Sequence, residues 1–397
     1  MNSIKEKIKL LAKNYSSEII SIRRHLHKNP ELSFEEYKTS DYISEYLEKL
    51  KIPHKRGVAK TGIVAIIEGK NPTKKTIALR ADMDALPIQE TNKVDYCSQN
   101  NGVMHACGHD VHSASLLGTA KILSEMKNEF EGTVKFIFQP GEERLPGGAS
   151  LMIKEGVLEN PTIQSIFGQH VMPFIDAGKV GFREGVYMAS ADEIYITVIG
   201  KGGHAAMPHL NIDPVLITSH IIIALQQIVS RNAKPGIPTV LSFGKVIANG
   251  ATNVIPDEVN IEGTFRTFDE SWRMDAHKRM KTMAESIASG MGGKCEFNIS
   301  VGYPVLVNEK NVTNSAKKNA KEFLGDDMVE DLDIWTAAED FAFYSEKVNS
   351  CFYRLGVRNE SKGIISPVHT STFDIDETAL EIGMGLMSWL AIKELEN

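Results

Sequence analysis

The sequence predicts an α/β fold, in which a domain with a mostly parallel sheet flanked by helices is interrupted by an inserted α+β domain of the ferredoxin-like type. Two observations support this prediction. Short β-rich runs alternate with amphipathic helical stretches before residue 187, which is typical of a parallel sheet with crossover helices. Between residues 187 and 303 the expected order becomes strand, helix, strand, strand, helix, strand, which is the βαββαβ unit.

The first part of the chain supplies the beginning of the parallel sheet. Residues 1–50 have helical spacing, which Asn29-Pro30 interrupts and which resumes from Glu31. Apolar residues of the stretch 111–126 recur every three or four positions, which predicts an amphipathic helix. Strands are expected at 62–67, 76–80 and 133–138.

The inserted segment contains clear helix signals. Asp213 is a good N-cap and Pro214 suits the first helical position, so a helix is expected from there to about residue 230. The other elements expected in this segment are strands at 193–199, 240–247, 259–267 and 294–301 and a helix from 270 to about 291.

The α/β pattern returns after residue 303. Helices are expected at 311–323, 340–345 and 377–393, and a strand is expected at 351–355. We therefore predict a discontinuous α/β domain of residues 1–186 and 304–397 and an inserted domain of residues 187–303.

The composition is that of a globular protein without a nucleic-acid or membrane partner. The chain has 397 residues, 42% of them hydrophobic, and a net charge of −7 with no Lys/Arg run that would suggest nucleic acid. No apolar run approaches the roughly 18 residues of a membrane-spanning helix, and the N-terminus lacks the apolar core of a secretory signal. We expect a cytoplasmic protein, in which the four cysteines are thiols. They are Cys97, Cys107, Cys295 and Cys351.

The stretch MHACGHDVH, residues 104–112, concentrates residue types that bind metals. Its cysteine could serve as a nucleophile, a redox thiol, half of a disulfide or a metal ligand. A reducing compartment argues against the disulfide, and the absence of a CxxC pattern argues against a redox pair. Thiolate and imidazole are standard zinc ligands, and Gly108 between Cys107 and His109 allows the backbone to bend so that both face one point.

Further ligand-type residues follow the predicted strands. Asp82 and Asp84 follow strand 76–80, the adjacent Glu142-Glu143 follows strand 133–138, and His170 ends the apolar run that precedes it. Ligands of an open α/β sheet bind outside the carboxyl ends of its strands, so these groups are expected to face one crevice.

The residues of this crevice are expected to have different catalytic roles. Adjacent side chains diverge, so one of the two glutamates would bind metal and the other would act as a general base. His170 and the distant His369 supply further nitrogen ligands. These ligands are too many for one tetrahedral ion, which favours two ions, and the sulfur of Cys107 could bridge them.

The chain resembles the dinuclear-metal aminoacylase and carboxypeptidase family, in the branch of hippurate hydrolases and plant auxin–amino-acid conjugate hydrolases. The resemblance covers essentially the whole chain. The motifs that carry it are IRRHLH (22–27) with Pro30-Glu31, RADMDALP (80–87), MHACGHDVH (104–112), QPGEE (139–143), GKGGH (200–204), NVIPD (253–257), GTFR (263–266) and HTSTF (369–373). Gly141 departs from the alanine usual before the two glutamates, and the segment 144–149 is not the commonest form, which leaves substrate preference open.

The resemblance implies a catalytic domain and an inserted lid that mediates dimerisation, so a homodimer or a higher oligomer is expected. It implies Glu142 as the general base and Asp84 as the aspartate that orients a ligand. A histidine ligand stands in related branches where this chain has Asp82. The implied metal ligands are Cys107, His109, Glu143, His170 and His369, and the implied substrate-binding residues are His204, Asn253 and Arg266.

The function implied is that of a metal-dependent amidohydrolase. It would cleave N-acetyl or N-aroyl amino acids to a carboxylic acid and a free amino acid, through a metal-activated water and the base Glu142. Two divalent ions per subunit are expected; the thiolate favours zinc, and manganese, cobalt and nickel remain open. The alternatives are a dipeptidase or carboxypeptidase of the same fold and a hydrolase with Cys107 as nucleophile. His105 and His112 are expected to support the ligands rather than bind metal, and Asp110 to cap the helix that begins there.

Overall fold

The computed structural model describes residues 3–397, and the chain divides into two compact units. The large unit extends to Gly185 and includes Val307–Asp333 and Asp340–Asn397. The small unit consists of Val186–Leu306 and Ile334–Glu339. Both junctions lie within a few residues of the predicted ones. The hexapeptide 334–339, which the prediction left in the α/β domain, belongs to the small unit by its contacts.

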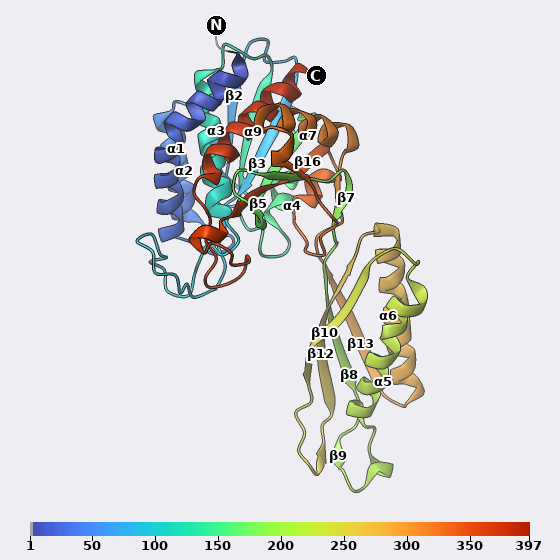
Figure 1. The fold of residues 1–397 in the computed structure, drawn as a ribbon. Coiled ribbons are helices and arrows are strands. Elements are labelled where there is room, and N and C mark those ends of the chain that lie inside the picture. The colour runs from blue at the N-terminus through green and yellow to red at the C-terminus, as the bar shows by residue number, and fades with distance from the viewer. Residues whose placement is uncertain (1–2) are drawn as a thin grey trace. The chain divides into compact units, whose positions relative to one another are not determined.

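An eight-stranded sheet forms the centre of the large unit, in the order β1-β2-β4-β3-β5-β16-β6-β15 (Figure 1). Its four central strands, β4, β3, β5 and β16, run parallel to one another, while β2 and β6 beside them run antiparallel. The predicted mostly parallel sheet is therefore confirmed. The strands are β1 (His54–Val58), β2 (Gly62–Glu68), β3 (Thr76–Asp82), β4 (Thr133–Gln139), β5 (Ser165–Asp176), β6 (Val180–Phe182), β15 (Val329–Asp331) and β16 (Asn349–Arg358).

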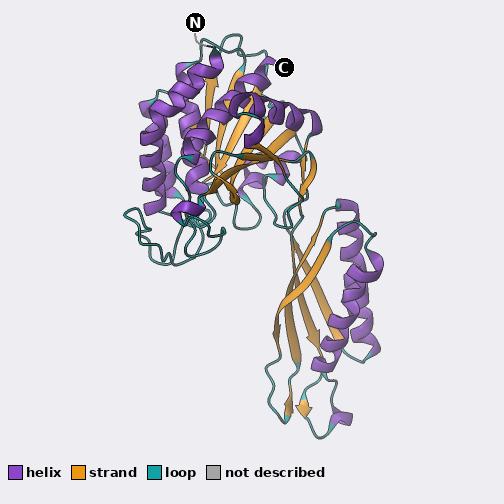
Figure 2. Cartoon of the chain, in the orientation of Figure 1, coloured by secondary structure: helices purple, strands orange, loops and turns teal. Residues whose placement is uncertain are grey.

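Helices pack over this sheet (Figures 1 and 2). Three of them, α1, α3 and α9, also pack closely against one another. The contact between α3 and α9 requires glycine, because a Cβ at Gly118 would lie 2.7 Å from Sδ of Met384. The helices of the large unit are α1 (Ile4–Lys28), α2 (Tyr37–Lys49), α3 (His109–Glu125), α4 (Gly148–Lys154), α7 (Lys310–Leu324), α8 (Ala342–Ser345) and α9 (Ala379–Glu396).

The small unit has the predicted βαββαβ order. Its antiparallel sheet runs β10-β12-β8-β13, and α5 and α6 pack together on it around a core of their own. Asp213 caps α5 as expected, because its carboxylate accepts hydrogen bonds from the amides of Val215 and Leu216. The elements are β8 (Asp192–Ile199), α5 (Pro214–Gln227) with a π-helical turn at Ile228–Asn232, β10 (Thr239–Ile247), β12 (Glu258–Thr267), α6 (Glu270–Gly290) and β13 (Lys294–Val301).

Several elements differ from the sequence-based expectation. Helical spacing was expected to resume at Glu31, but α2 begins only at Tyr37, and the segment before it is a loop. Several elements were not predicted: in the large unit these are β1, β6, β15 and the helix α4. The others are two pairs of short strands, β7 (Gly185–Met188) with β14 (Leu306–Asn308), and β9 (Gly203–His204) with β11 (Val254–Ile255).

Among the described residues, one helical stretch is long and apolar enough to cross a membrane by length and composition. It is Pro214–Asn232, with a mean hydropathy of 1.2 and 33% of the stretch buried. A helix of this kind is weak evidence for a membrane span, because core helices of other proteins pass the same test.

Candidate metal centre

The five side chains predicted as metal ligands converge in the large unit. Cys107 and His109 stand at the start of α3, Glu143 follows β4, His170 lies on β5, and His369 lies in the loop before α9. They form overlapping groups in which all ligand atoms lie within 4.8 Å of one another. These groups are Cys107–His109–His170, Cys107–Glu143–His369 and, with the predicted base, His109–Glu142–Glu143.

The turn that begins α3 depends on a glycine. Gly108 has φ +81°, and a Cβ there would lie 2.6 Å from Cγ2 of Val171. The N-cap is Gly108 and not Asp110, so the predicted capping role of Asp110 is wrong. Asp110 lies in the first turn, fully buried, and accepts hydrogen bonds from Arg23 Nε at 2.7 Å and the ring of His27 at 2.8 Å. Ion pairing inside the core, rather than capping, therefore explains its presence.

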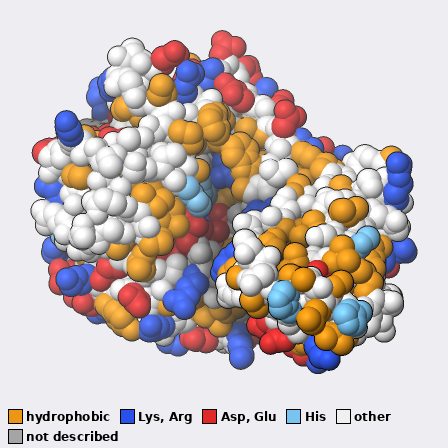
Figure 3. All heavy atoms as spheres, turned by 90° about the horizontal axis from the view of Figure 1, so that it is seen from below, with side chains coloured by type: hydrophobic (Ala, Val, Ile, Leu, Met, Phe, Trp, Pro, Cys, Tyr) orange, Lys and Arg blue, Asp and Glu red, His pale blue; other side chains and the backbone are white. Residues whose placement is uncertain are grey.

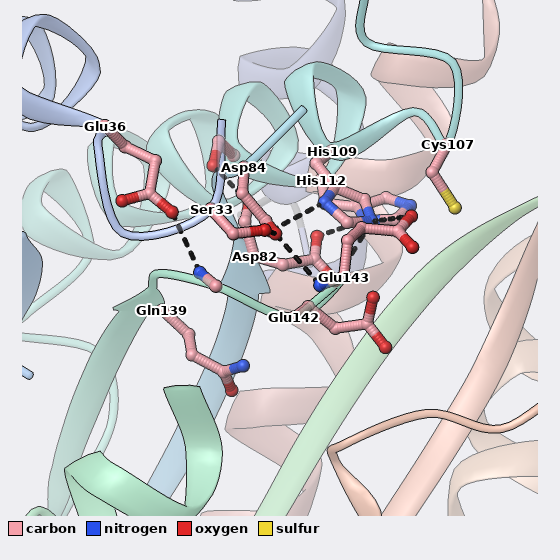
Figure 4. Close-up of polar contacts among 12 residues, drawn as sticks. Ser33, Glu36, Asp82, Asp84, Cys107, His109, His112, Gln139, Glu142 and Glu143 are labelled. Atoms are coloured by element: carbon pink, nitrogen blue, oxygen red, sulfur yellow. Dashed lines mark hydrogen bonds and ion pairs between the residues drawn. The ribbon is translucent and has the colours of Figure 1, made fainter. Parts of the chain in front are cut away.

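His109 is oriented by Asp84, as predicted for that aspartate (Figure 4). Its Nδ1 donates to Asp84 Oδ1 at 3.1 Å, which leaves Nε2 facing Glu143 Oε1 at 3.9 Å. Burial alone would lower the pKa of His109, but Asp82, Asp84 and Glu143 together raise it to about 10. The surroundings of this ring therefore attract a positive charge strongly.

His170 presents a neutral imidazole to the centre. Its Nδ1 donates to the carbonyl of Val171 at 2.8 Å, and its Nε2 lies 3.5 Å from Cys107 Sγ. Burial, helped by the cation of Arg354, holds the pKa of His170 well below its usual value. The expectation that His170 ends a strand is wrong. Pairing with β3 stops at Gly168, but β5 continues to Asp176 because it stays paired with β16.

Cys107 is shared by two of the ligand groups. Its sulfur lies 3.5 Å from His170 Nε2 and 3.3 Å from His369 Nε2. Burial, followed by the charges of Glu143 and Glu142, raises the pKa of this thiol well above its usual value. A protonated thiol is a poor nucleophile, whereas a bound cation would stabilise the thiolate. This environment favours the ligand role over the nucleophile alternative.

The residues fit a divalent metal. His109 Nε2 and Glu143 Oε1 are both buried and have no hydrogen-bond partner among the described residues. Buried polar atoms without a hydrogen bond are rare in folded proteins, and here the two lie 3.9 Å apart, with His369 Nε2 3.2 Å from the same oxygen of Glu143. Thiolate, imidazole and carboxylate form the donor set of zinc, and a sulfur common to two groups suits two ions bridged by one ligand.

A second layer of contacts supports the ligands. His112 donates from Nδ1 to Asp82 Oδ1 at 2.5 Å, and its Nε2 accepts the amide of Val171 at 2.9 Å, so it holds α3 against β3 and β5. Arg80 pairs with the other oxygen of Asp82 at 2.7 Å. His105 is fully buried as well, and neither of its ring nitrogens has a hydrogen-bond partner among the described residues. Neither histidine belongs to a group that contains Cys107, but His112 forms a further possible ligand group with Asp82 and His109. The supporting roles of His105 and His112 stay predictions.

Sequence reasoning missed two residues of this layer. Ser33 donates to Asp84 Oδ2 at 2.6 Å, and Glu36 accepts the amide of Gly141 at 2.9 Å (Figure 4). Both lie in the loop that was expected to be helical. The only sequence signal that could have indicated a loop here was Pro30 and the polar run that follows it.

The three predicted substrate-binding residues lie in the small unit. His204 on β9 pairs with Val254 on β11, which places Asn253 next to it. Arg266 lies on β12, and its Nη1 donates to the carbonyl of Thr336 at 3.2 Å.

Comparison with known proteins decides the family. The model of "Peptidase family M20/M25/M40" matches residues 78–393. The chain belongs to this family. An M20 peptidase is a metal-dependent hydrolase of amide bonds, so the predicted reaction class is confirmed.

Three relatives show how similar M20 proteins are to this chain. An N-acyl-L-amino acid amidohydrolase of Geobacillus stearothermophilus is 43% identical over 77% of this chain and 81% of its own length. Thermostable carboxypeptidase 2 of Saccharolobus solfataricus is 40% identical over 98% of both chains. The crystal structure of the Bacillus subtilis YXEP protein, described as a dinuclear metal binding peptidase, has a TM-score of 0.83 at 36% identity, covering 97% of this chain and 99% of that one.

Proposed function

We propose that this M20 protein hydrolyses N-acyl amino acids, with acetyl or aroyl groups, to a carboxylic acid and a free amino acid. The observation that carries the proposal is the position of Glu142. Its buried carboxylate lies within 4.8 Å of ligand atoms of His109 and Glu143, yet it belongs to neither group that contains Cys107. A carboxylate that lies next to the predicted ligands but outside both groups that share Cys107 is in a suitable position for a general base.

The predicted site residues divide into those that would bind the metal ions and those that would take part in the reaction. Cys107, His109, Glu143, His170 and His369 would hold two divalent ions, with zinc favoured by the sulfur ligand. When bound, such ions lower the pKa of water and polarise a carbonyl oxygen. The protein's own contribution is to hold the ligand rings in fixed tautomers, as Asp84 does for His109.

Glu142 would move the proton. Its carboxylate accepts a proton from the attacking water and delivers it to the leaving amine. In the small unit, His204 would donate to the developing oxyanion, Asn253 would contact the amide, and the guanidinium of Arg266 would pair with the free carboxylate of the substrate. The relative from Geobacillus stearothermophilus, an amidohydrolase of N-acyl-L-amino acids, supports this choice of substrate.

Peptide hydrolysis is the second candidate, because the Saccharolobus relative is a carboxypeptidase. A substrate panel separates the two functions. Purified protein would be assayed with N-acetyl-L-methionine, N-benzoylglycine, the dipeptide Ala-Ala and a blocked peptide with a free C-terminal residue. The proposal expects turnover of the N-acyl amino acids. A preference for the dipeptide or the blocked peptide would replace it with the second candidate, and turnover of none would refute both.

We also propose a homodimer formed through α5. Leu216 and Ile223 on this helix are 51% and 73% exposed, although both are apolar. Figure 3 shows hydrophobic side chains lying among histidines on the surface of the protein. Exposed apolar patches of this kind mark association sites.

A further inference from the structure

The segment that carries Glu142 is held by two buried carboxylates. Oε1 of Glu36 accepts the amide of Gly141 at 2.9 Å, and Oδ2 of Asp84 accepts the amide of Glu143 at 2.9 Å. These amides stand directly before and after Glu142. Figure 4 shows Glu36 on one side of this backbone and the carboxylate of Glu142 pointing away from it. Asp84 also orients a predicted ligand, whereas Glu36 has no contact with any of them among its hydrogen bonds.

Glu36 is itself fixed in place. Its side chain is fully buried, and the oxygen that accepts Gly141 also accepts the amide of Phe34 at 2.8 Å. The second oxygen accepts the hydroxyl of Thr61 at 2.6 Å. One carboxylate therefore joins three segments: the loop before α2, the turn between β1 and β2, and the loop after β4.

The backbone at one end of this contact is strained. Phe34, which is not glycine, has φ +65°, whereas Gly141 has φ +61°, which glycine adopts without strain. A Cβ at Gly141 would lie 2.4 Å from the ring of Phe34, so the ring covers the glycine closely. Conformations of this kind persist only where surrounding contacts over-determine them, and they cluster at functional sites. The hydrogen bonds to Glu36 are such contacts, because the same oxygen accepts the amide of the strained Phe34 and the amide of Gly141 that its ring covers.

We propose that Glu36 is a positioning residue, which sets the place of the base Glu142 by holding the amide of Gly141. This inference rests on the proposed function, in which Glu142 moves the proton. A carboxylate displaced by about 1 Å can cost roughly a hundredfold in rate, so a group that fixes the neighbouring peptide contributes to kcat. The geometry needs acceptor oxygens and not the negative charge.

The conservative variant follows from this distinction. In Glu36→Gln the amide oxygen would still accept from Phe34 and Gly141, and the amide nitrogen would donate to the hydroxyl of Thr61. Glu36→Ala removes all three contacts. Glu36→Asp keeps the charge but is one methylene too short to reach Gly141, and it remains informative if the alanine variant does not fold.

The matched control is Glu31→Ala in the same loop. Glu31 accepts the amide of Thr39 at 2.9 Å and the hydroxyl of Thr39 at 3.0 Å, so it supports α2 without touching the loop after β4. The control reports the effect of loosening this region without releasing Gly141.

Each variant would be loaded with zinc, and its metal content, melting temperature, kcat and KM would be measured on N-acetyl-L-methionine or N-benzoylglycine. We expect Glu36→Gln to keep kcat within about twofold, and Glu36→Ala and Glu36→Asp to lose about tenfold or more in kcat with KM and metal content nearly unchanged. Glu31→Ala should lower the melting temperature and leave kcat unchanged.

Three results would overturn the inference. They are wild-type kcat in both Glu36→Ala and Glu36→Asp, an equal loss of kcat in Glu31→Ala, or a loss of metal that accounts for the loss of rate. Failure of the proposed function gives a different result, since the wild-type protein would then not hydrolyse either N-acyl substrate.

Discussion

At the scale of single residues, the difference between Glu142 and Glu143 is the central feature of the site. They are neighbours in sequence, but only Glu143 shares a group with Cys107 and His369. Glu142 instead accepts the amide of Asp340 at 3.4 Å and is buried beside His109. The two positions therefore respond differently to the same substitution.

We expect Glu142→Gln to keep its metal and to lose hydrolysis by about a hundredfold to ten-thousandfold, because the amide fills the same space and cannot accept a proton. Metal analysis and initial rates on N-acetyl-L-methionine would test this. Glu155→Gln, in the exposed residue after α4, is the control and should retain full activity. Rates of Glu142→Gln within tenfold of wild type would refute the assignment of the base.

Glu36 also gives a prediction for pH dependence. Burial, followed by the charge of Asp84, raises the pKa of Glu36 from 4.5 to about 7. Because the folded pKa is the higher one, the native state binds the proton more tightly, and this contribution to stability is present below pH 4.5 and lost as the pH rises to 7.

Glu36→Gln has no such proton. Its free energy of unfolding relative to wild type should increase by about 3 kcal/mol between pH 4.5 and 7 and stay constant above that. Urea denaturation of both proteins at pH 5 and pH 8, with equal metal loading, measures the difference. Parallel stability curves would show that the carboxyl is ionised throughout.

The ligands could be predicted at this scale because their residue types carry a chemical signature. Cys107, His109 and His170 belong to motifs that ordinary core sequence does not contain. The role of Glu36 could not be predicted from the sequence, because it accepts a hydrogen bond from a backbone amide. No residue pattern distinguishes this role from that of any other buried hydrogen-bond acceptor. Asp110 was misjudged because its partner Arg23 is 87 positions away.

At the scale of elements, α5 combines a capped N-terminus with an unusually apolar exposed face. Asp213 fixes where the helix begins, so the register of its exposed residues is fixed as well. Leu216 and Ile223 lie on the part of the helix that the small unit does not cover.

Ile223→Glu should convert the proposed dimer to a monomer, because a carboxylate in an apolar interface is costly to bury. Sedimentation velocity measures the change. Leu10→Glu, at a residue of α1 that is 50% exposed, is the matched control and should leave the sedimentation coefficient unchanged. A dimer that persists in Ile223→Glu would refute an interface through α5.

Long elements with strong periodicity were the easiest to predict. The strand expected at 294–301 is β13 (Lys294–Val301), because its alternation continues to both ends. The strands β6, β14 and β15 have three residues each, which is too short to show a period. The start of α2 was misplaced because Ser33 and Glu36 serve buried contacts at positions that also fit helical spacing.

At the scale of the whole molecule, metal binding should be linked to the stability of the large unit. The proposed ligands come from α3, the loop after β4, β5 and the loop before α9, so bound ions would join segments from residue 107 to residue 369. The unfolded chain would not hold these residues together.

Removal of metal by EDTA should therefore abolish activity and lower the melting temperature, and added zinc or manganese should restore both. Ligand at a thousandfold excess over its Kd stabilises by about 4 kcal/mol, which is a shift of several degrees. Calorimetry before and after chelation measures it. Full activity after exhaustive chelation would favour the alternative with Cys107 as nucleophile.

The convergence of the site was predictable because strand ends of a parallel sheet meet at one edge. The order of the sheet was not, since it depends on pairings between distant segments. The placement of β16 between β5 and β6 joins residues about 349–358 to strands that end before residue 183. Local patterns contain no information about such a pairing.

The position of β16 between β5 and β6 also affects the order in which the protein folds during its synthesis on the ribosome. β5 and β6 are synthesised long before β16, so the sheet lacks the strand between them until residue 358 has been translated, and α9 follows still later. The small unit is complete by Leu306 apart from one hexapeptide. Domains fold as units during synthesis, so the insertion would form first, and the sheet of the large unit, which carries the metal ligands, would close only once β16 has been translated.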